Sequence, residues 1–291
     1  MPHQALILVR PRTSLRRGRA TYDRDVTSRA QDGVLTVLTL NIWGDHLWEE
    51  RKHALVDWFT EIRPDVVALQ EATRSPELCE ATWLAEQTGM DAVFAAAYVR
   101  PDRSDFGNAV LSRWPIVDSR SLQLTLAGSN IEPRGALTVD VRVRNRLVSV
   151  TSTHLSYQFD AGWVREAQVR QLADFVGTGS GDFPPIVCGD FNARPESTEV
   201  RHISGLLFDA FQEAHPGELG FTWNNTNPYT AQDPTPDQRI DYIFVGARTA
   251  DGAGKVLDAA VVCNAPRRGV WPSDHFGVVA QLACPAPPLI R

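Results

Sequence analysis

The sequence predicts an α/β fold in which short strands form mixed sheets that helices cover. From Val34 onward, short runs rich in Val, Ile and Leu are bounded by Gly, Pro, Asn or Asp, as strands are. Amphipathic segments separate the early strands, and closely spaced strands in the middle of the chain suggest hairpins. With 291 residues, of which 43% are hydrophobic, the chain is long enough to bury a large core.

The expected strands are short, apolar and bounded by turn-forming residues. They are residues 35–42, 65–69, 92–98, 108–111, 136–143, 147–152, 185–188, 240–245, 256–262 and 276–282. The expected helices are residues 49–62, 76–88, 163–176 and 196–205. In the first helix apolar side chains recur at helical spacing from Ala54 to Ile62, and Gly89 is a plausible stop for the second.

The chain is expected to form one domain with two extensions. Residues 1–32 show no periodicity and predict a disordered, arginine-rich extension. Residues 33–284 contain no internal repeat and no Gly/Ser linker, and residues 285–291 form a Pro-rich tail. The extension carries seven arginines and three aspartates, a net charge of +4, which leaves −10 on the rest of a chain whose total is −6.

Composition argues against several classes of protein. No apolar run is long enough to span a bilayer. The apolar residues 5–9 precede the arginines, the reverse of a secretory signal, so a cytoplasmic location is expected. The four cysteines lie far apart and indicate neither a zinc cluster nor a disulfide framework. The acidic body is a poor surface for sequence-independent binding to nucleic acid.

Polar residues stand at the ends of several expected strands. Asp274 and His275 lie between a Pro-broken turn and the strand at 276–282, where a carboxylate and an imidazole can serve a metal ion and a proton. Asp190 and Asn192 follow Gly189 and, being two apart, can face one side of an extended backbone. Alone, both residues are equally at home in a turn.

Three further residues have a chemical and a structural interpretation. Glu71 ends a buried apolar run, where burying a carboxylate costs free energy unless it is paired or bound to a hard divalent cation. The alternative is that Glu71 lies in a surface loop. His154 follows a strand and is either a functional or a hydrogen-bonded structural histidine. Asp241 could orient a histidine and raise its basicity, or form an ion pair with Arg239.

Taken in order, these clusters resemble one known family. The motifs that carry the resemblance contain Asn41, Gln70-Glu71, Asn108 within residues 107–112, Thr153-His154-Leu155, Gly189-Asp190-Phe191-Asn192, Arg239-Ile240-Asp241-Tyr242 and Ser273-Asp274-His275. Their order is similar to that of the endonuclease/exonuclease/phosphatase superfamily, of the deoxyribonuclease I type. The resemblance implies a four-layered α/β/β/α sandwich with two mixed sheets packed face to face.

The resemblance also implies hydrolysis of a phosphate ester by water with Mg²⁺, for which Mn²⁺ can substitute. Glu71 is then the main metal ligand, and Asn41 and Asp274 are its companions. Among the implied catalytic residues, Asp190 and Asn192 position the water and the phosphate, and Asp241 pairs with His275. His154 donates to the phosphate or protonates the leaving oxygen. The implied substrate-binding residues are Asn108, Arg134 and Trp223. Whether the aspartate or the histidine pair is the general base stays open.

Two observations bear on the substrate. The acidic body argues against a nonspecific nuclease, and residues 108–116 look more like the sphingomyelinase and phosphatase branches than the repair nucleases. A small phosphodiester or phosphomonoester, including a phospholipid head group, is therefore preferred. The alternatives are a DNA or RNA nuclease helped by the arginine-rich extension, and a catalytically silent binding module. Every expected site position is filled, which disfavours the silent module, and no protein partner is evident.

Overall fold

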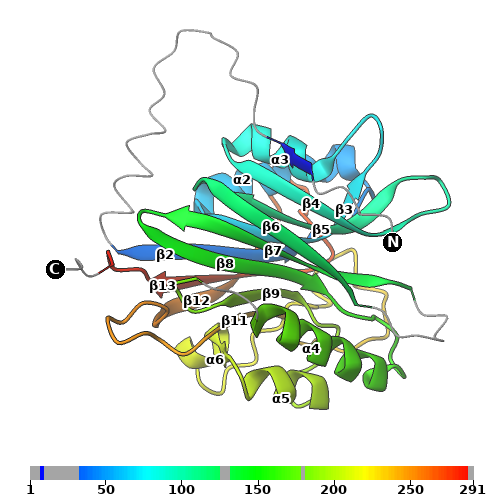
Figure 1. Ribbon diagram of the computed structural model, residues 1–291. Helices are drawn as coiled ribbons and strands as arrows, with labels where there is room; N and C mark the ends of the chain where they lie inside the picture. Colours follow the sequence, from blue (N-terminus) through cyan, green and yellow to red (C-terminus); the bar gives the residue numbers. More distant parts are fainter. Residues whose placement is uncertain (1–6, 10–32, 125–131, 178–180, 288–291) are drawn as a thin grey trace, which may run out of the picture.

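The fold is built on two sheets that pack face to face between helices. The computed structural model describes residues 7–9, 33–124, 132–177 and 181–287 (Figure 1). The first sheet has seven strands in the order β1-β4-β5-β3-β2-β13-β12, and the second has six in the order β10-β11-β9-β8-β7-β6. Both sheets are mixed, because β2 and β3 pair in parallel, as do β8 and β9, among otherwise antiparallel neighbours.

The strands have the following bounds. In the first sheet they are β1 (Ile7–Val9), β2 (Val34–Asn41), β3 (Val66–Arg74), β4 (Asp91–Val99), β5 (Asp105–Ser112), β12 (Val256–Val262) and β13 (Gly277–Ala283). In the second they are β6 (Ile116–Leu124), β7 (Arg134–Val143), β8 (Arg146–His154), β9 (Ile186–Asp190), β10 (Phe208–Asp209) and β11 (Asp241–Val245).

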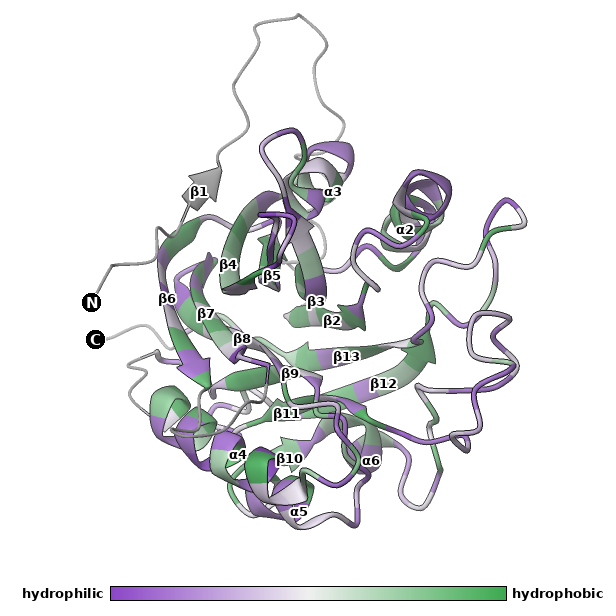
Figure 2. Cartoon of the chain, turned by 90° about the vertical axis from the view of Figure 1, so that its right-hand side faces the viewer, coloured by the Kyte–Doolittle hydropathy of each residue, from purple (hydrophilic) through white to green (hydrophobic). Residues whose placement is uncertain are grey.

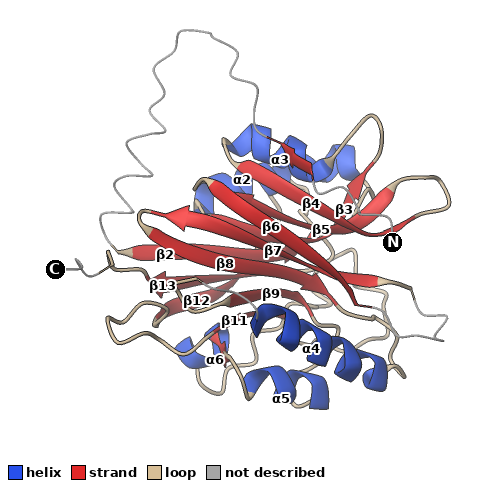
Figure 3. Cartoon of the chain, viewed as in Figure 1, coloured by secondary structure: helices blue, strands red, loops and turns tan. Residues whose placement is uncertain are grey.

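Helices cover both outer faces of the sandwich. Figure 3 shows α2 (Trp48–Ile62) and α3 (Glu80–Thr88) on the first sheet, and α4 (Gly162–Gly177) and α5 (Thr198–Ser204) on the second. The short α6 (Ala210–Ala214) contacts β11 and β12. The predicted four-layered α/β/β/α sandwich is thus confirmed. No helix in the described ranges is long and apolar enough to cross a membrane.

The central strands are apolar throughout because both of their faces are buried. Successive strand residues point to opposite faces, so Val37 packs between the sheets while Leu38 packs under α2 and α3. In the second sheet Ile186 likewise faces the inter-sheet core and Val187 faces α4 and α5. The hydrophobic inner layers are visible in the view of Figure 2. Burial on two sides explains why these strands appear in the sequence as continuous apolar runs.

The structure differs from the prediction where strands are polar or elements are short. β6 was not predicted because it is an edge strand, in which only the terminal residues Ile116 and Leu124 are buried. β10 and α6, of two and five residues, are too short to show a period. The second helix was expected from residue 76 but begins at Glu80, because the hydroxyl of Ser75 accepts backbone hydrogen bonds from residues 77 and 78 and holds a turn there.

The expectation of disorder for residues 1–32 is wrong for residues 7–9. These three apolar residues form β1, which pairs antiparallel with the outer edge of β4. An open strand edge offers unpaired backbone groups, and a β-prone segment can bind them. Residues 1–6 and 10–32 of the extension and residues 288–291 of the tail lie outside the described residues.

One buried carboxyl joins α3 to β3. The Oε2 atom of Glu80 accepts a hydrogen bond from the backbone N–H of Thr73 at 2.7 Å, and the side chain is 1% exposed. Burial raises the pKa of Glu80 from 4.5 to about 8, although Arg51 and Arg100 lower it and Asp45 raises it further. The folded protein therefore holds a proton on Glu80 that the unfolded chain releases near its ordinary pKa.

We predict that Glu80 makes stability fall as the pH rises. Between pH 4.5 and about 8 the folded state binds the extra proton, so the free energy of unfolding decreases with pH, by at most about 1.4 kcal/mol per unit for one proton. Glu80→Gln keeps an acceptor for Thr73 without the titration. Urea unfolding at pH 5.5 and 7.5 should show wild type losing stability relative to the variant, and a difference that is the same at both pH values would contradict this account.

Candidate active site

The predicted site residues converge at one end of the sandwich. β2, β8 and β9 end there, while β11 and β13 begin there. A cleft of about 690 Å³ opens at this end. Most of the predicted residues line it: Glu71, Arg134, His154, Asp190, Asn192, Trp223, Asp274 and His275. Asn41, Asn108 and Asp241 are 0%, 2% and 0% exposed and lie behind the cleft wall.

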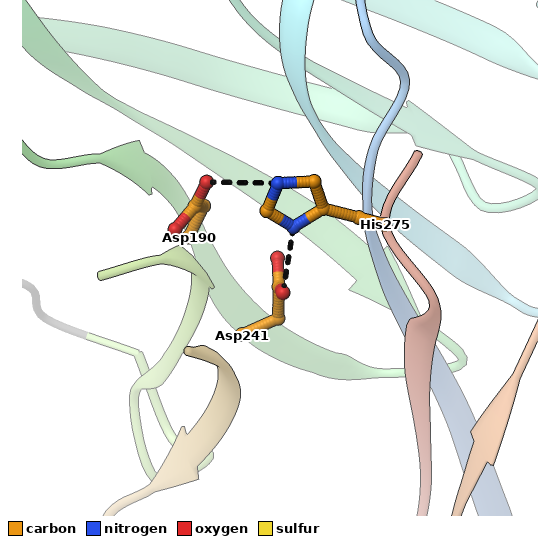
Figure 4. Close-up of side chains that lie close together, drawn as sticks. All are labelled: Asp190, Asp241 and His275. Atoms are coloured by element: carbon orange, nitrogen blue, oxygen red, sulfur yellow. Dashed lines mark hydrogen bonds and ion pairs between the residues drawn. The ribbon is translucent and has the colours of Figure 1, made fainter. Parts of the chain in front are cut away.

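Figure 4 shows a chain of carboxylate, imidazole and carboxylate, formed by Asp190, His275 and Asp241. Asp190 and His275 line the cleft, and Asp241 lies behind them. The Nδ1 atom of His275 lies 2.9 Å from Oδ2 of Asp241, a hydrogen-bond distance. Its other nitrogen, Nε2, faces Oδ2 of Asp190 at 3.8 Å. Asp241 is thus the partner of the histidine, as the resemblance implied, and its alternative pairing with Arg239 is wrong because Arg239 pairs with Asp209.

Burial and charge set the protonation of this chain. Burial favours neutral His275, but Asp241 and Asp190 outweigh it and raise the pKa of His275 well above its ordinary value. Burial and the charge of Asp241 raise the pKa of Asp190 to about 7, against the opposing effects of His275, Asn192 and Asn41. His275 therefore favours the imidazolium form, and Asp190 gains or loses its proton near pH 7.

Asn41 connects the two sheets at the site. Its Nδ2 atom donates to Oε1 of Glu71 at 3.0 Å and to Oδ2 of Asp190 at 3.1 Å. Glu71 belongs to the first sheet and Asp190 to the second, so one amide fixes two carboxylates across the inter-sheet seam. The amide oxygen of Asn41, the atom that would bind a metal, accepts a hydrogen bond from the backbone N–H of Trp43 at 3.0 Å.

Glu71 lies at an irregularity in β3. The prediction ended this strand at Leu69, but β3 continues to Arg74, and its register against β5 shifts between Leu69 and Ala72. Glu71 has φ of +57°, which is uncommon for a residue with a side chain. A bulge of this kind redirects a side chain, and here Glu71 reaches the cleft.

Asp274 is the second carboxylate on the Glu71 side of the cleft. Burial raises the pKa of Asp274 to about 6, His275 opposes the rise, and the charge of Glu71 adds to it. Asp274 Oδ1 also accepts a hydrogen bond from the hydroxyl of Ser273 at 3.1 Å. The two carboxylates, with an amide beside them, form an all-oxygen donor set that suits a hard divalent cation.

Asp190, Asp241 and His275 also bring potential ligand atoms within 4.8 Å of one another. We assign this cluster to proton chemistry, because the facing atoms of Asp241 and His275 already share a proton at 2.9 Å. A metal ion there would have to displace that proton and would face an imidazolium. The Glu71 and Asp274 side of the cleft fits a cation better.

His154 and Asn192 form the opposite side of Asp190. The amide nitrogen of Asn192 lies 3.0 Å from Nε2 of His154, which in turn is 3.5 Å from Oδ2 of Asp190. Burial, with the charges of Arg134 and His275, lowers the pKa of His154 well below its ordinary value, so this imidazole is neutral. Its Nδ1 atom is buried without a partner among the described residues.

The predicted substrate-binding residues differ in position. Asn108 does not reach the cleft: its Nδ2 donates to the carbonyl of Gly135 at 2.8 Å and ties β5 to β7 across the sheets. Arg134 lines the cleft, where it forms an ion pair with Glu132 at 2.9 Å. Trp223 packs edge-on against His275 with ring centroids 5.0 Å apart.

Sequence reasoning missed several side chains that line the cleft. The main ones are Tyr98, Arg100, Tyr157, Phe159, Arg165, Arg194 and Glu199. Most lie in loops or at element ends, where periodicity carries no information. Proximity to a motif was the available signal, because Tyr157 follows His154 by three residues and Arg194 follows Asn192 by two.

Comparison with known proteins identifies a family for this chain. The chain matches the Endonuclease/Exonuclease/phosphatase family over residues 38–275. Nocturnin from Drosophila melanogaster is 30% identical over 279 residues, which cover 80% of this chain and 42% of nocturnin. Sphingomyelinase C from Bacillus cereus is 23% identical over 216 residues, 64% of each protein. The chain thus spans less than two thirds of the length of these two curated relatives.

Solved structures share the fold. TDP2 from D. rerio, complexed with a single-strand DNA product, has a TM-score of 0.71 at 19% identity, over 86% of this chain and 99% of that one. The family match spans every residue expected in the site, from Asn41 to His275. The chain therefore belongs to the Endonuclease/Exonuclease/phosphatase family, whose named activities all hydrolyse phosphate esters.

Proposed function

We propose that this protein is a Mg²⁺-dependent phosphoesterase that hydrolyses a phosphodiester or phosphomonoester by direct attack of water. The observation that carries the proposal is the arrangement around Asp190. A carboxylate with both oxygens held in place faces an imidazolium, and the carboxylates of Glu71 and Asp274 lie in the same cleft. A base, an acid and a cation site side by side are what phosphate ester hydrolysis requires.

Asp190 is the residue that orients the attacking water and takes its proton. Its Oδ1 accepts a hydrogen bond from the backbone N–H of Asn192 at 2.8 Å, and its Oδ2 accepts from Asn41 at 3.1 Å. These bonds fix the direction in which the carboxylate points. A base that is already oriented needs no rearrangement at the moment of reaction.

His275 stabilises the charge that develops on the phosphate. The 3.8 Å separation between its Nε2 and Asp190 is too long for a hydrogen bond and leaves Nε2–H available to a phosphate oxygen. Asp241 holds the other nitrogen and keeps the ring oriented. A positioned, buried cationic donor is the kind of group that lowers such a barrier most.

His154 and Asn192 are the second group of phosphate contacts in this proposal. In the free protein Nε2 of neutral His154 accepts a hydrogen bond from the amide of Asn192. The negative charge of a bound phosphate favours the imidazolium, which donates a hydrogen bond to the phosphate or to the leaving oxygen, as the resemblance implied. Asn192, with φ of +49° directly after β9, holds the imidazole and also donates to the carbonyl of Leu155 at 3.2 Å. Arg134 and Trp223 contact the substrate beside them.

The residues that hold the cation are Glu71 and Asp274, with Asn41 positioning Glu71 and offering its amide oxygen. Their oxygen atoms suit Mg²⁺ and accept Mn²⁺ in its place. When bound, the cation supplies positive charge that offsets the charge developing on the phosphate.

Charge in the cleft favours a small substrate over a long polyanion. Three of the four arginines that line it are paired with carboxylates: Arg100 with Asp45, Arg134 with Glu132 and Arg165 with Glu199. A nuclease neutralises many phosphates at once, which needs unpaired cations. We therefore prefer a small molecule or a lipid head group, the latter supported by the similarity to sphingomyelinase C.

A nuclease of the same family is the second candidate, favoured by the fold shared with TDP2, whose structure holds a DNA product. The arginine-rich extension would have to supply the missing positive charge. A catalytically silent module remains a remote alternative, because all the expected site positions are filled.

We predict Mg²⁺-dependent release of nitrophenol from bis(nitrophenyl) phosphate, and its loss in Asp190→Ala. Removing one member of an acid–base pair typically lowers the rate by about 10²–10⁴-fold. A panel that adds phosphomonoesters, sphingomyelin and supercoiled plasmid, the last scored for nicking, separates the substrate classes at equal enzyme concentration. The absence of turnover across the panel with either Mg²⁺ or Mn²⁺ would contradict the proposed activity.

A second prediction concerns the orientation of His275. Asp241→Asn keeps the shape of the side chain but removes its charge, so the imidazolium is lost and turnover should fall by about 10²-fold or more. The KM should change little, because Asp241 lies behind the cleft wall. The rate constants of Asp209→Asn, which alters the partner of Arg239 outside the cleft, provide the control. Equal effects of the two substitutions would contradict the assigned role.

A further inference from the structure

We propose that Tyr157 and Phe159 form a stacking platform for a planar ring of the substrate, beside the phosphate site. The inference rests on the proposed function and, of the two preferred substrate classes, selects small phosphate esters with an aromatic or heteroaromatic ring, such as a nucleobase, over lipid head groups. It concerns the loop between β8 and α4, residues 155–161.

The two side chains are far more exposed to solvent than aromatic side chains usually are. Tyr157 is 57% exposed and Phe159 is 80% exposed, and both line the cleft. Neighbouring apolar side chains that are exposed at the rim of a cleft are typical of a binding surface. An aromatic face offers a planar ligand a contact that no polar side chain provides.

Buried groups hold this loop in place. Nη1 of Arg165 donates to the carbonyls of Ser156 at 3.1 Å and Gln158 at 2.6 Å, while its Nε pairs with Glu199 at 2.6 Å. Ser156 is 1% exposed, so its side chain is turned inward while that of the next residue, Tyr157, is turned out. The loop is therefore a fixed support, and the Arg165–Glu199 pair acts as its positioning element.

The platform lies next to the reacting groups. Tyr157 follows His154 by three residues, and the guanidinium carbon of Arg134 lies 5.6 Å from the Tyr157 ring centroid. Arg134 and His154 both line the cleft with Asp190. A phosphate held by these groups thus places its attached organic part against Tyr157, with Phe159 further out along the loop.

A ring fits these observations better than a lipid bilayer does. Residues 33–291 carry the net charge of −10 that remains outside the basic extension, and Asp160 adds a negative charge within the loop. Proteins that dock on membranes usually combine exposed apolar residues with basic ones. Four more aromatic side chains line the same cleft: Trp43, Tyr98, Phe106 and Trp223.

Calorimetric binding of phenylphosphonate and methylphosphonate, with Mg²⁺ present, tests the platform without turnover. Wild type should bind the phenyl compound roughly 10-fold more tightly, which corresponds to about 1.4 kcal/mol. The double variant Tyr157→Ala/Phe159→Ala should lose this preference while it binds methylphosphonate as wild type does. Tyr157→Phe retains the ring and should keep the preference.

Trp163→Ala is the matched control. Trp163 is 59% exposed at the start of α4 but does not line the cleft, so its removal should leave the preference unchanged. A preference that survives in the double variant, or is absent from wild type, would overturn the platform and leave the phosphoesterase proposal intact. If neither phosphonate binds, the phosphate site itself fails, and both proposals fall.

Phosphatidylcholine vesicles distinguish a lipid surface from a ring. If wild type cosediments with such vesicles, and Phe159→Ala and Trp163→Ala reduce this binding equally, the exposed aromatic residues bind a membrane. This result would overturn the platform. The expected result is no cosedimentation of any of the three proteins.

Discussion

Four carboxylates gathered at one end of the sandwich are the constraint around which the site is organised. Glu71, Asp190, Asp241 and Asp274 come from distant parts of the sequence, and burial together with a nearby like charge raises the pKa of Asp190 and of Asp274. The fold holds them with one imidazolium, His275, and one bridging amide. The negative charge that remains is the physical reason why we propose a cation at Glu71 and Asp274.

The two-sheet architecture is what brings these groups together. Asn41, Glu71 and His275 lie on or next to strands of the first sheet, and Asp190 and Asp241 belong to the second. Neither sheet holds a complete site. Within the second sheet, the close approach of β9 to β8 beside the site depends on Gly189, because a Cβ there would lie 2.0 Å from the carbonyl oxygen of Thr153. The packing of the two sheets therefore also sets the relative positions of the residues in the site.

Sequence reasoning succeeds where burial imposes a period or where a motif carries the chemistry. The doubly buried strands were predicted to within a few residues, and the motif order identified the residues around the cleft. It fails at the polar edge strand β6 and at the end of β3, which continues past the predicted Leu69 to Arg74 through an irregularity that no local pattern indicates. Asn108 was expected at the substrate and instead ties the sheets together. The aromatic loop at residues 155–161 has no period, and only tertiary contacts through Arg165 define its shape.

A calorimetric titration with Mg²⁺ tests most directly our proposal that the Glu71 side of the cleft binds a divalent cation. Wild type should bind Mg²⁺, Glu71→Gln should weaken binding by about tenfold or more, and Glu196→Gln, an exposed cleft carboxylate outside the cluster, should leave it unchanged. Equal Mg²⁺ affinity in wild type and Glu71→Gln, or no binding by wild type, would contradict the account.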